Sequence, residues 1–182
     1  GNPAKPTTVM AMQPAQAMQM SSKLERIFFG LAWTNAAGGR TVDIDASVIS
    51  FSQGQQVDCV SFQQLGNSSR TLKHTGDIMH GASTKGEDME RIYMWLANMD
   101  ATVDSLVMTA NVYTQGLDFS ALSSAYVRVA NADTNQELGR MWLGGEGFQK
   151  MSAGNNAIVF AKAYRYGGHW QVMMLGQPLS VP

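Results

Sequence analysis

Hydrophobic and polar residues alternate along much of this chain after residue 23. The clearest case is the segment 42–49, VDIDASVI, in which apolar and polar side chains take turns. A period of two is typical of a β-strand, whose successive side chains point to opposite faces. We therefore expect Asp43 and Asp45 to leave the same face of one strand.

Short runs of β-branched and aromatic residues, separated by turn residues, continue the pattern. They lie at 24–33, 57–62, 91–96, 106–113, 126–130, 137–143, 157–166 and 169–175. Many short strands with turns between them predict an all-β fold, an antiparallel two-sheet β-sandwich with at most short helices. Residues 117–124 fit neither period, and we expect a short helix or an irregular crossing there.

We expect the tryptophans and one arginine within these runs to stabilise the fold rather than to bind a ligand. Core packing is the favoured role for the four tryptophans, Trp33, Trp95, Trp142 and Trp170. Arg165 has aromatic neighbours in the sequence, and we expect it to form a structural ion pair.

The first 23 residues, GNPAKPTTVMAMQPAQAMQMSSK, show no sustained period and contain three prolines. They predict an extended or flexible N-terminal arm (1–23), followed by one sandwich domain (24–182). The methionines of the arm are flexible apolar groups suited to contact with a neighbouring surface. The alternative is a disordered tail, which is common at chain termini.

Composition narrows the classes of function. Charged residues make up 15% of the chain and the net charge is −1, without a run of Lys or Arg, so we expect no nucleic-acid partner. No apolar run approaches the roughly 20 residues of a membrane-spanning helix, and we expect a soluble protein without a membrane span. The single cysteine, Cys59, excludes an internal disulfide. With no signal-peptide pattern, we expect a cytoplasmic location or one within an assembled particle.

Acidic residues concentrate in two short pieces of the chain. Asp43 and Asp45 together with residues 74–90 hold six of the 14 acidic side chains, and glycines punctuate the second piece. Calcium takes roughly six to eight oxygen ligands from flexible backbone, so this pattern favours a calcium site. Two aspartates about 6.7 Å apart on a strand repel by roughly 2.5 kcal/mol. A shared cation, backbone N–H donors or solvent exposure would each offset that repulsion.

Zinc and hydrolytic chemistry are weaker interpretations. The three histidines, His74, His80 and His169, are too few and too scattered to predict a transition-metal site. The chain lacks a Gly-x-Ser-x-Gly nucleophile elbow, and we expect no catalytic residues.

Five segments form a recognisable series, in order and at sensible spacing: Gly30-Leu31-Ala32-Trp33, Val42-Asp43-Ile44-Asp45-Ala46-Ser47, His74-Thr75-Gly76-Asp77, Glu87-Asp88-Met89-Glu90, and Tyr164-Arg165-Tyr166-Gly167-Gly168-His169-Trp170 running on to Gly176-Gln177. With this series the chain resembles the TerD family of tellurite-resistance and stress-response domains over about residues 24–178. The resemblance implies a calcium-binding (Ca2+) β-sandwich without established catalytic chemistry. The metal ligands that it implies are Asp43, Asp45, Asp77, Glu87, Asp88 and Glu90.

The chain departs from the family pattern in the acidic segment. The family usually has Asp, Asn and Thr where this chain has Thr34, Ile78 and His80, and the loop is about two residues longer, with Lys85 inside it. Each lost oxygen lowers the charge and the number of ligands, which set calcium affinity. A degenerate loop that retains only the fold is therefore the alternative.

Two functions follow from these observations. The first is a non-enzymatic, calcium-binding stress-response domain of the tellurium-resistance type, whose cation-ordered acidic loops contact protein partners or another copy. The second is a structural subunit of a larger homo-oligomeric particle or fibre, with a degenerate calcium site and the Met-rich arm reaching into a neighbour.

Overall fold

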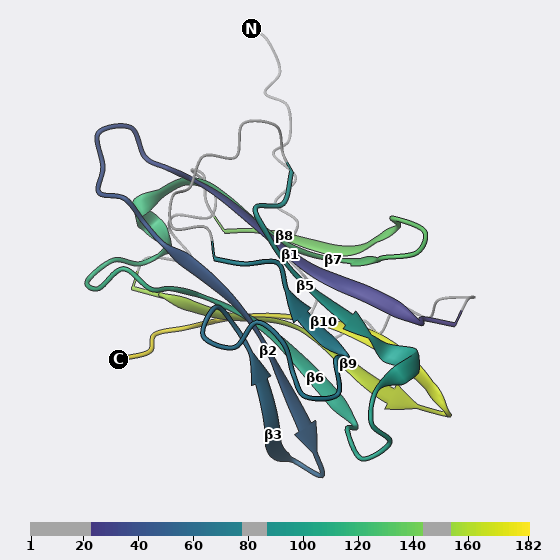
Figure 1. Cartoon of the computed structure of the whole chain (residues 1–182). Helices are drawn as coiled ribbons and strands as arrows, with labels where there is room; N and C mark the ends of the chain where they lie inside the picture. Colours follow the sequence, from purple (N-terminus) through teal and green to yellow (C-terminus); the bar gives the residue numbers. More distant parts are fainter. Residues whose placement is uncertain (1–22, 78–86, 144–153) are drawn as a thin grey trace, which may run out of the picture.

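The computed structural model describes residues 23–77, 87–143 and 154–182 (Figure 1). Within these ranges the chain forms ten strands and two single-turn 3-10 helices. They are β1 (Arg26–Asn35), β2 (Ile44–Ser52), β3 (Gln55–Val60), β4 (Leu72–His74), β5 (Glu90–Trp95), η1 (Leu96–Asn98), β6 (Ser105–Val112), η2 (Phe119–Ala121), β7 (Leu122–Asn131), β8 (Glu137–Trp142), β9 (Ala157–Tyr166) and β10 (His169–Leu179).

The strands form two five-stranded sheets that lie face to face as two layers (Figure 1). One sheet has the order β4-β5-β1-β7-β8 and the other β10-β9-β6-β2-β3. Every paired strand runs antiparallel to its neighbour. The expected antiparallel two-sheet β-sandwich is confirmed.

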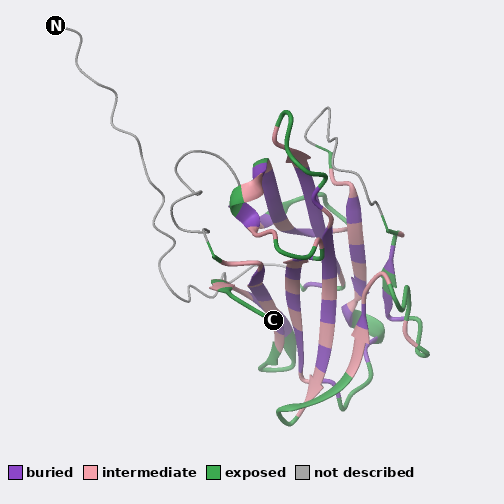
Figure 2. Ribbon diagram, turned by 90° about the vertical axis from the view of Figure 1, so that its left-hand side faces the viewer, coloured by how far each residue is buried: buried purple, intermediate pink, exposed green. Residues whose placement is uncertain are grey.

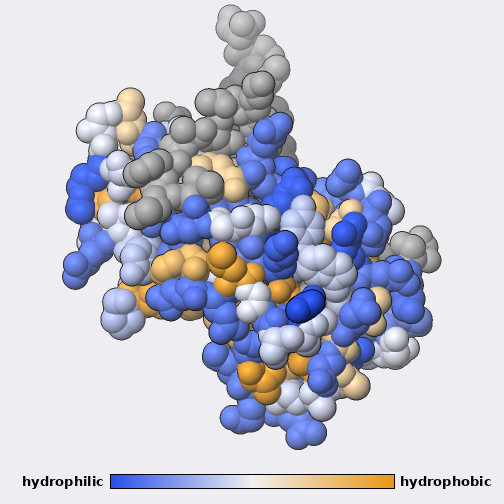
Figure 3. All heavy atoms as spheres, viewed as in Figure 1, coloured by the Kyte–Doolittle hydropathy of each residue, from blue (hydrophilic) through white to orange (hydrophobic). Residues whose placement is uncertain are grey.

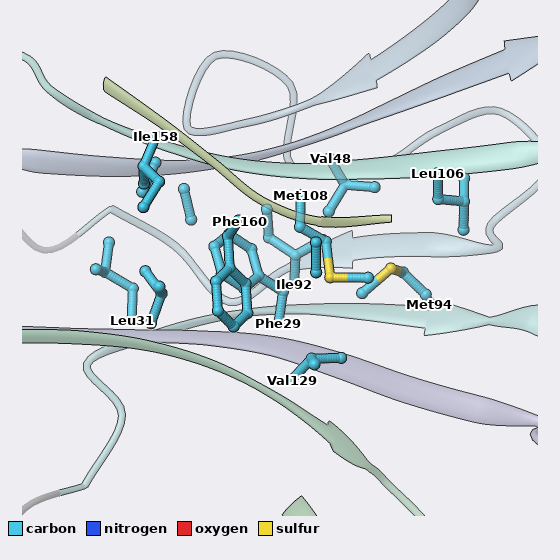
Figure 4. Packing of buried hydrophobic residues seen from close by; sticks show 14 of the residues in the cluster. Phe29, Leu31, Val48, Ile92, Met94, Leu106, Met108, Val129, Ile158 and Phe160 are labelled. Atoms are coloured by element: carbon cyan, nitrogen blue, oxygen red, sulfur yellow. The ribbon is translucent and has the colours of Figure 1, made fainter. Parts of the chain in front are cut away.

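The core lies between the sheets and follows from the alternation in the sequence. Buried and partly exposed residues form alternating bands along many of the strands (Figure 2). Phe29 of β1 and Phe160 of β9 stack across the two layers with ring centroids 5.7 Å apart (Figure 4). Both rings are fully buried, so this contact is one of those that hold the sheets together.

Most strand positions agree with the sequence, and the exceptions have local causes. Strand β4 is only three residues long, too short to show a period. In the segment 117–124 a single 3-10 turn, Phe119–Ala121, leads directly into β7. Asp118 caps this turn by accepting a hydrogen bond from the Ser120 N–H at 2.8 Å.

The tryptophans divide between the core and the surface. Trp33 and Trp170 are buried in the core, as expected. The expectation is wrong for Trp142, which is 52% exposed on β8. Trp142 lies at the edge of its sheet and packs edge-on against Tyr126 on the neighbouring strand, with ring centroids 5.5 Å apart.

The outer surface is mainly hydrophilic on the face shown in Figure 3, with hydrophobic side chains gathered in a few small areas. In the described ranges, no helix is long and apolar enough to cross a bilayer. Residues 1–22 of the expected arm lie outside these ranges, so the arm stays a prediction.

Candidate metal centre

Asp43 and Asp45 are held at the start of β2 by alternation and by backbone contacts. Ile44 and Ala46 point into the core, which places the two aspartates on the other side of the chain. The Asp43 N–H donates to the Thr114 hydroxyl at 2.8 Å, and the Asp43 carbonyl accepts from the Tyr113 N–H at 2.8 Å. The backbone under both carboxylates is thereby fixed.

Asp77 reaches the same place from the other sheet. It follows β4, whose continuation pairs with β5: the Thr75 N–H donates to the Arg91 carbonyl, and the Arg91 N–H donates to the Thr75 hydroxyl, both at 2.9 Å. Gly76 then adopts a φ of +117°, a conformation that favours glycine. This turn brings Asp77 beside the aspartates of β2.

Asp43, Asp45 and Asp77 form what we call the acidic group. One carboxylate oxygen from each residue lies within 4.8 Å of those of the other two. At that separation two charged carboxylates repel by about 3 kcal/mol at an effective dielectric of 20. The structure thus brings together carboxylates from two segments far apart in the sequence, and their mutual repulsion disfavours the charged forms.

Asp45 is the member of the acidic group whose charged form is disfavoured by burial. It is 2% exposed, and its buried Oδ2 atom has no hydrogen-bond partner within residues 23–77, 87–143 and 154–182. Burial raises the pKa of Asp45 to about 7, with further increases from the charges of Asp43, Glu90 and Asp77 and a smaller decrease from His74. A bound cation would stabilise the ionised form, because it supplies the positive charge that this environment lacks.

Glu90 and His74 form a buried pair beside the acidic group. The His74 Nε2 atom lies 3.5 Å from Glu90 Oε2, and both side chains are fully buried. His74 Nδ1 accepts a hydrogen bond from the Gly76 N–H at 2.9 Å, which assigns the proton of a neutral ring to Nε2, facing Glu90. Neither ring nitrogen then has a lone pair free for a metal, so the oxygen donors define the chemistry of the site.

The remaining expected ligands lie outside the acidic group. Glu90 is close enough to influence Asp45 but is not one of the three residues whose oxygens converge. Glu87 is exposed. His80 falls in the segment 78–86, outside the described residues.

Asp88 requires a correction to its expected role. Its carboxylate is fully buried and binds Arg91, Arg128 and the Tyr126 hydroxyl, at 2.6 to 3.0 Å. Arg128 and Tyr126 lie about 40 positions further along the chain, so the local sequence gave no sign of this pairing. Asp88 therefore has a structural role here, because its carboxylate is paired with side chains of the protein itself.

Comparison with known proteins agrees with the fold and with the order of these segments. The TerD domain matches residues 9–181, which is most of the chain. The chain belongs to the TerD family. The match to the TerD domain starts inside the segment that the sequence pattern predicts as an arm.

Relatives of this TerD domain carry names linked to stress. General stress protein 16U of Bacillus subtilis is 29% identical over 162 residues, covering 84% of this chain and 80% of that protein. Chemical-damaging agent resistance protein B of Clostridium acetobutylicum is 32% identical over 123 residues, covering 66% of this chain and 84% of that protein. These matches support a stress-response domain.

A solved structure agrees with the fold. The crystal structure of a homologue of the telluride resistance protein TerD from Streptomyces coelicolor superposes with a TM-score of 0.73. It is 16% identical in sequence, and the match covers 87% of this chain and 92% of that one. At this identity the likeness concerns the fold alone.

Proposed function

We propose that this TerD-family chain is a non-enzymatic stress-response domain that binds a divalent cation, calcium, through Asp43, Asp45 and Asp77. The observation that carries the proposal is the convergence of three carboxylates, among them that of Asp45, whose buried Oδ2 has no hydrogen-bond partner in the described part of the chain. Such an arrangement is costly without a positive charge and favourable with one.

The chemistry of the donors selects the kind of cation. The acidic group offers carboxylate oxygens only, and the adjacent His74 is committed to Glu90 and to Gly76. Oxygen donors suit hard cations such as calcium, whereas zinc is usually bound through His or Cys. Three carboxylates do not fill the roughly six to eight positions that calcium takes, so main-chain oxygens or water complete the shell.

The raised pKa of Asp45 would also suit a residue that transfers protons in catalysis. The surroundings of Asp45 favour cation binding over that use. Two further carboxylates crowd it within 4.8 Å, and a bound cation would offset the repulsion among the three. The stress-response role rests on the names of the relatives and on membership of the family.

Isothermal titration calorimetry of the whole chain with calcium chloride tests the proposal. We expect saturable binding at pH 7.5, and we expect Asp45→Asn to abolish it, because the amide removes the central charge. Asp58→Asn is the matched control: Asp58 accepts hydrogen bonds from the Cys59 N–H and the Gln64 amide and lies outside the acidic group. Heat no greater than that of dilution for the parent chain would disprove calcium binding.

A further inference from the structure

The outer face of the sheet that contains β1 has a gap in its side chains at Gly30. The core residues Phe29 and Leu31 flank Gly30, so it faces outward. Its partners across the neighbouring strands are Arg91 on β5 and Arg128 on β7. The two guanidinium groups thus stand on either side of a position without a side chain.

The carboxylate of Asp88 fills this gap. A Cβ atom added at Gly30 would lie 2.7 Å from Asp88 Cγ and 2.8 Å from each carboxylate oxygen, which is closer than real Cβ contacts. Arg128 donates from Nε to Oδ1 and from Nη2 to Oδ2, both at 2.7 Å, and Arg91 Nε donates to Oδ2 at 2.6 Å. We call this arrangement of Asp88, Gly30, Arg91 and Arg128 the clamp.

Two cationic side chains stabilise the buried carboxylate of the clamp. Burial alone would raise the pKa of Asp88, but hydrogen bonds from Arg128 and Arg91 hold it below its ordinary value. Both arginines also lie over the Phe28 ring, at 4.3 Å and 5.0 Å from its centroid. The two guanidinium groups are therefore held by an aromatic face on one side and a carboxylate on the other.

A bend in the backbone follows directly after Asp88. Met89 packs against the core, and its N–H donates to the Leu31 carbonyl at 2.8 Å. Glu90, the register partner of Leu31, is fully buried as well. Two consecutive side chains thus turn inward, and Asp88 and Arg91 on either side of them turn outward and pair.

The bend connects the clamp to the acidic group by two short routes. Glu90 comes directly after Met89 and faces His74, and its charge acts on Asp45. Arg91 holds Asp88 with its side chain, and its backbone N–H and C=O bond to Thr75, two residues before Asp77.

We propose that Asp88 is a positioning residue for the cation site. From the opposite face of the sheet it fixes the bend that orients Glu90, and through Arg91 it fixes the segment after β4 that carries Asp77. This inference rests on the proposed function, because it assigns a support to the same site. Asp88 does not itself touch the cation, since its two oxygens are already bound by two arginines and a tyrosine.

A double-mutant cycle on the whole chain, read by calcium titration calorimetry, tests the inference. We expect Asp88→Ala to weaken the calcium Kd about 10- to 100-fold, the range typical when the outer support of a metal site is removed. Gly30→Ala alters no charge, yet we expect it to weaken the Kd as well, because its Cβ displaces the Asp88 carboxylate. In the Asp88→Ala background, Gly30→Ala should change the Kd less than about twofold, since the displaced group is already gone.

A merely structural role would give a different result. Asp133→Asn is the matched control. Asp133 pairs at 3.0 Å with Arg26, which lies on β1 as Gly30 does, and it takes no part in the clamp. We expect it to shift the urea midpoint of unfolding without changing the Kd. If Asp88→Ala behaves like this control, lowering the midpoint and leaving the Kd within about twofold of the parent, the positioning role is overturned.

The same experiment separates failure of this inference from failure of the proposed function. Absence of calcium binding by the parent chain disproves the proposed function and leaves only the local part of the inference to be tested, namely the support of the bend that orients Glu90. The inference is then judged by crystal structures of the parent and of Gly30→Ala. Displacement of Glu90 from His74 in the variant supports the positioning role, and an unchanged pair overturns it.

Discussion

At the scale of single residues, Asp45 shows how position decides the chemistry of a side chain. Asp43, just before β2, and Asp45, within it, are chemically identical and two positions apart, yet Asp45 is almost completely buried and Asp43 is only partly buried. Burial removes the water that would stabilise the charge of Asp45, and the neighbouring carboxylates add repulsion. The charged state of this one residue therefore opposes folding when no cation is bound.

The destabilising effect of the charge on Asp45 can be measured from the pH dependence of the free energy of unfolding. The pKa of Asp45 rises from an ordinary value of 3.8 to about 7 in the folded chain, so the folded chain binds this proton more tightly than the unfolded chain. Without calcium, we expect the free energy of unfolding to fall by a few kcal/mol as the pH rises from about 4 to above 7. Urea unfolding in EDTA at several pH values measures the slope.

Asp45→Asn should remove most of that slope. We expect the variant to be more stable than the parent at pH 8 in EDTA, and less stable than the parent once calcium is in excess. Asp58→Asn should retain the slope of the parent. A parent chain whose stability is flat between pH 4 and pH 8 would contradict the assignment.

The residues of the acidic group were accessible from the sequence, whereas the role of Asp88 was not. Strand alternation places Asp43 and Asp45 on one side of β2, and the family resemblance adds Asp77. Asp88 looks like a further ligand because it lies in the same acidic run. Its partners Tyr126 and Arg128 lie on β7. The space above Gly30 that Asp88 fills can be recognised only once the strands that pair with β1 are known.

At the scale of elements, the segment between β5 and β6 is organised by one arginine from β9. Arg165 donates from Nε to the Val103 carbonyl at 2.9 Å and from Nη2 to the Met99 and Asp100 carbonyls, both at 3.1 Å. Its guanidinium also lies 4.6 Å from the centroid of the Trp170 ring. The sequence predicts a structural ion pair for Arg165, but its hydrogen-bond partners among the described residues are backbone carbonyls, which have no signature in the sequence.

Arg165→Lys should loosen this segment. A lysine keeps the charge but lacks the planar fork that reaches three carbonyls at once, so we expect a loss of about 1–2 kcal/mol of stability. Hydrogen exchange of residues 96–104 should become faster than that of β1. Arg40→Lys, at an exposed loop position, should change neither quantity. Unchanged exchange in 96–104 would show that the segment is held by other contacts.

At the scale of the whole molecule, the alternation of apolar residues was sufficient to predict the class of fold. Together with the short runs of β-branched and aromatic residues between turns, it locates nine of the ten described strands. It does not give the order of strands in each sheet, which depends on pairing between distant segments. It also cannot distinguish a tryptophan at a sheet edge, such as Trp142, from one in the core.

The stack between the two sheets gives a test at this scale. Phe160→Ala removes a ring that is fully buried against Phe29, and we expect a loss of about 3–5 kcal/mol of stability, measured by urea unfolding. Tyr166→Ala, on the same strand but 68% exposed, should cost less than about 1 kcal/mol. Equal losses for the two variants would contradict the observed layering.

The acidic group takes Asp43 and Asp45 from beside and within β2 and Asp77 from the segment after β4, which belong to different sheets. An ion held there would tie the two layers at one end of the sandwich, as a crosslink does, but reversibly. Calcium would then set how easily this end of the domain opens under heat or force. The calcium concentration would thus determine the mechanical stability of this end of the domain, without a change in the strands themselves.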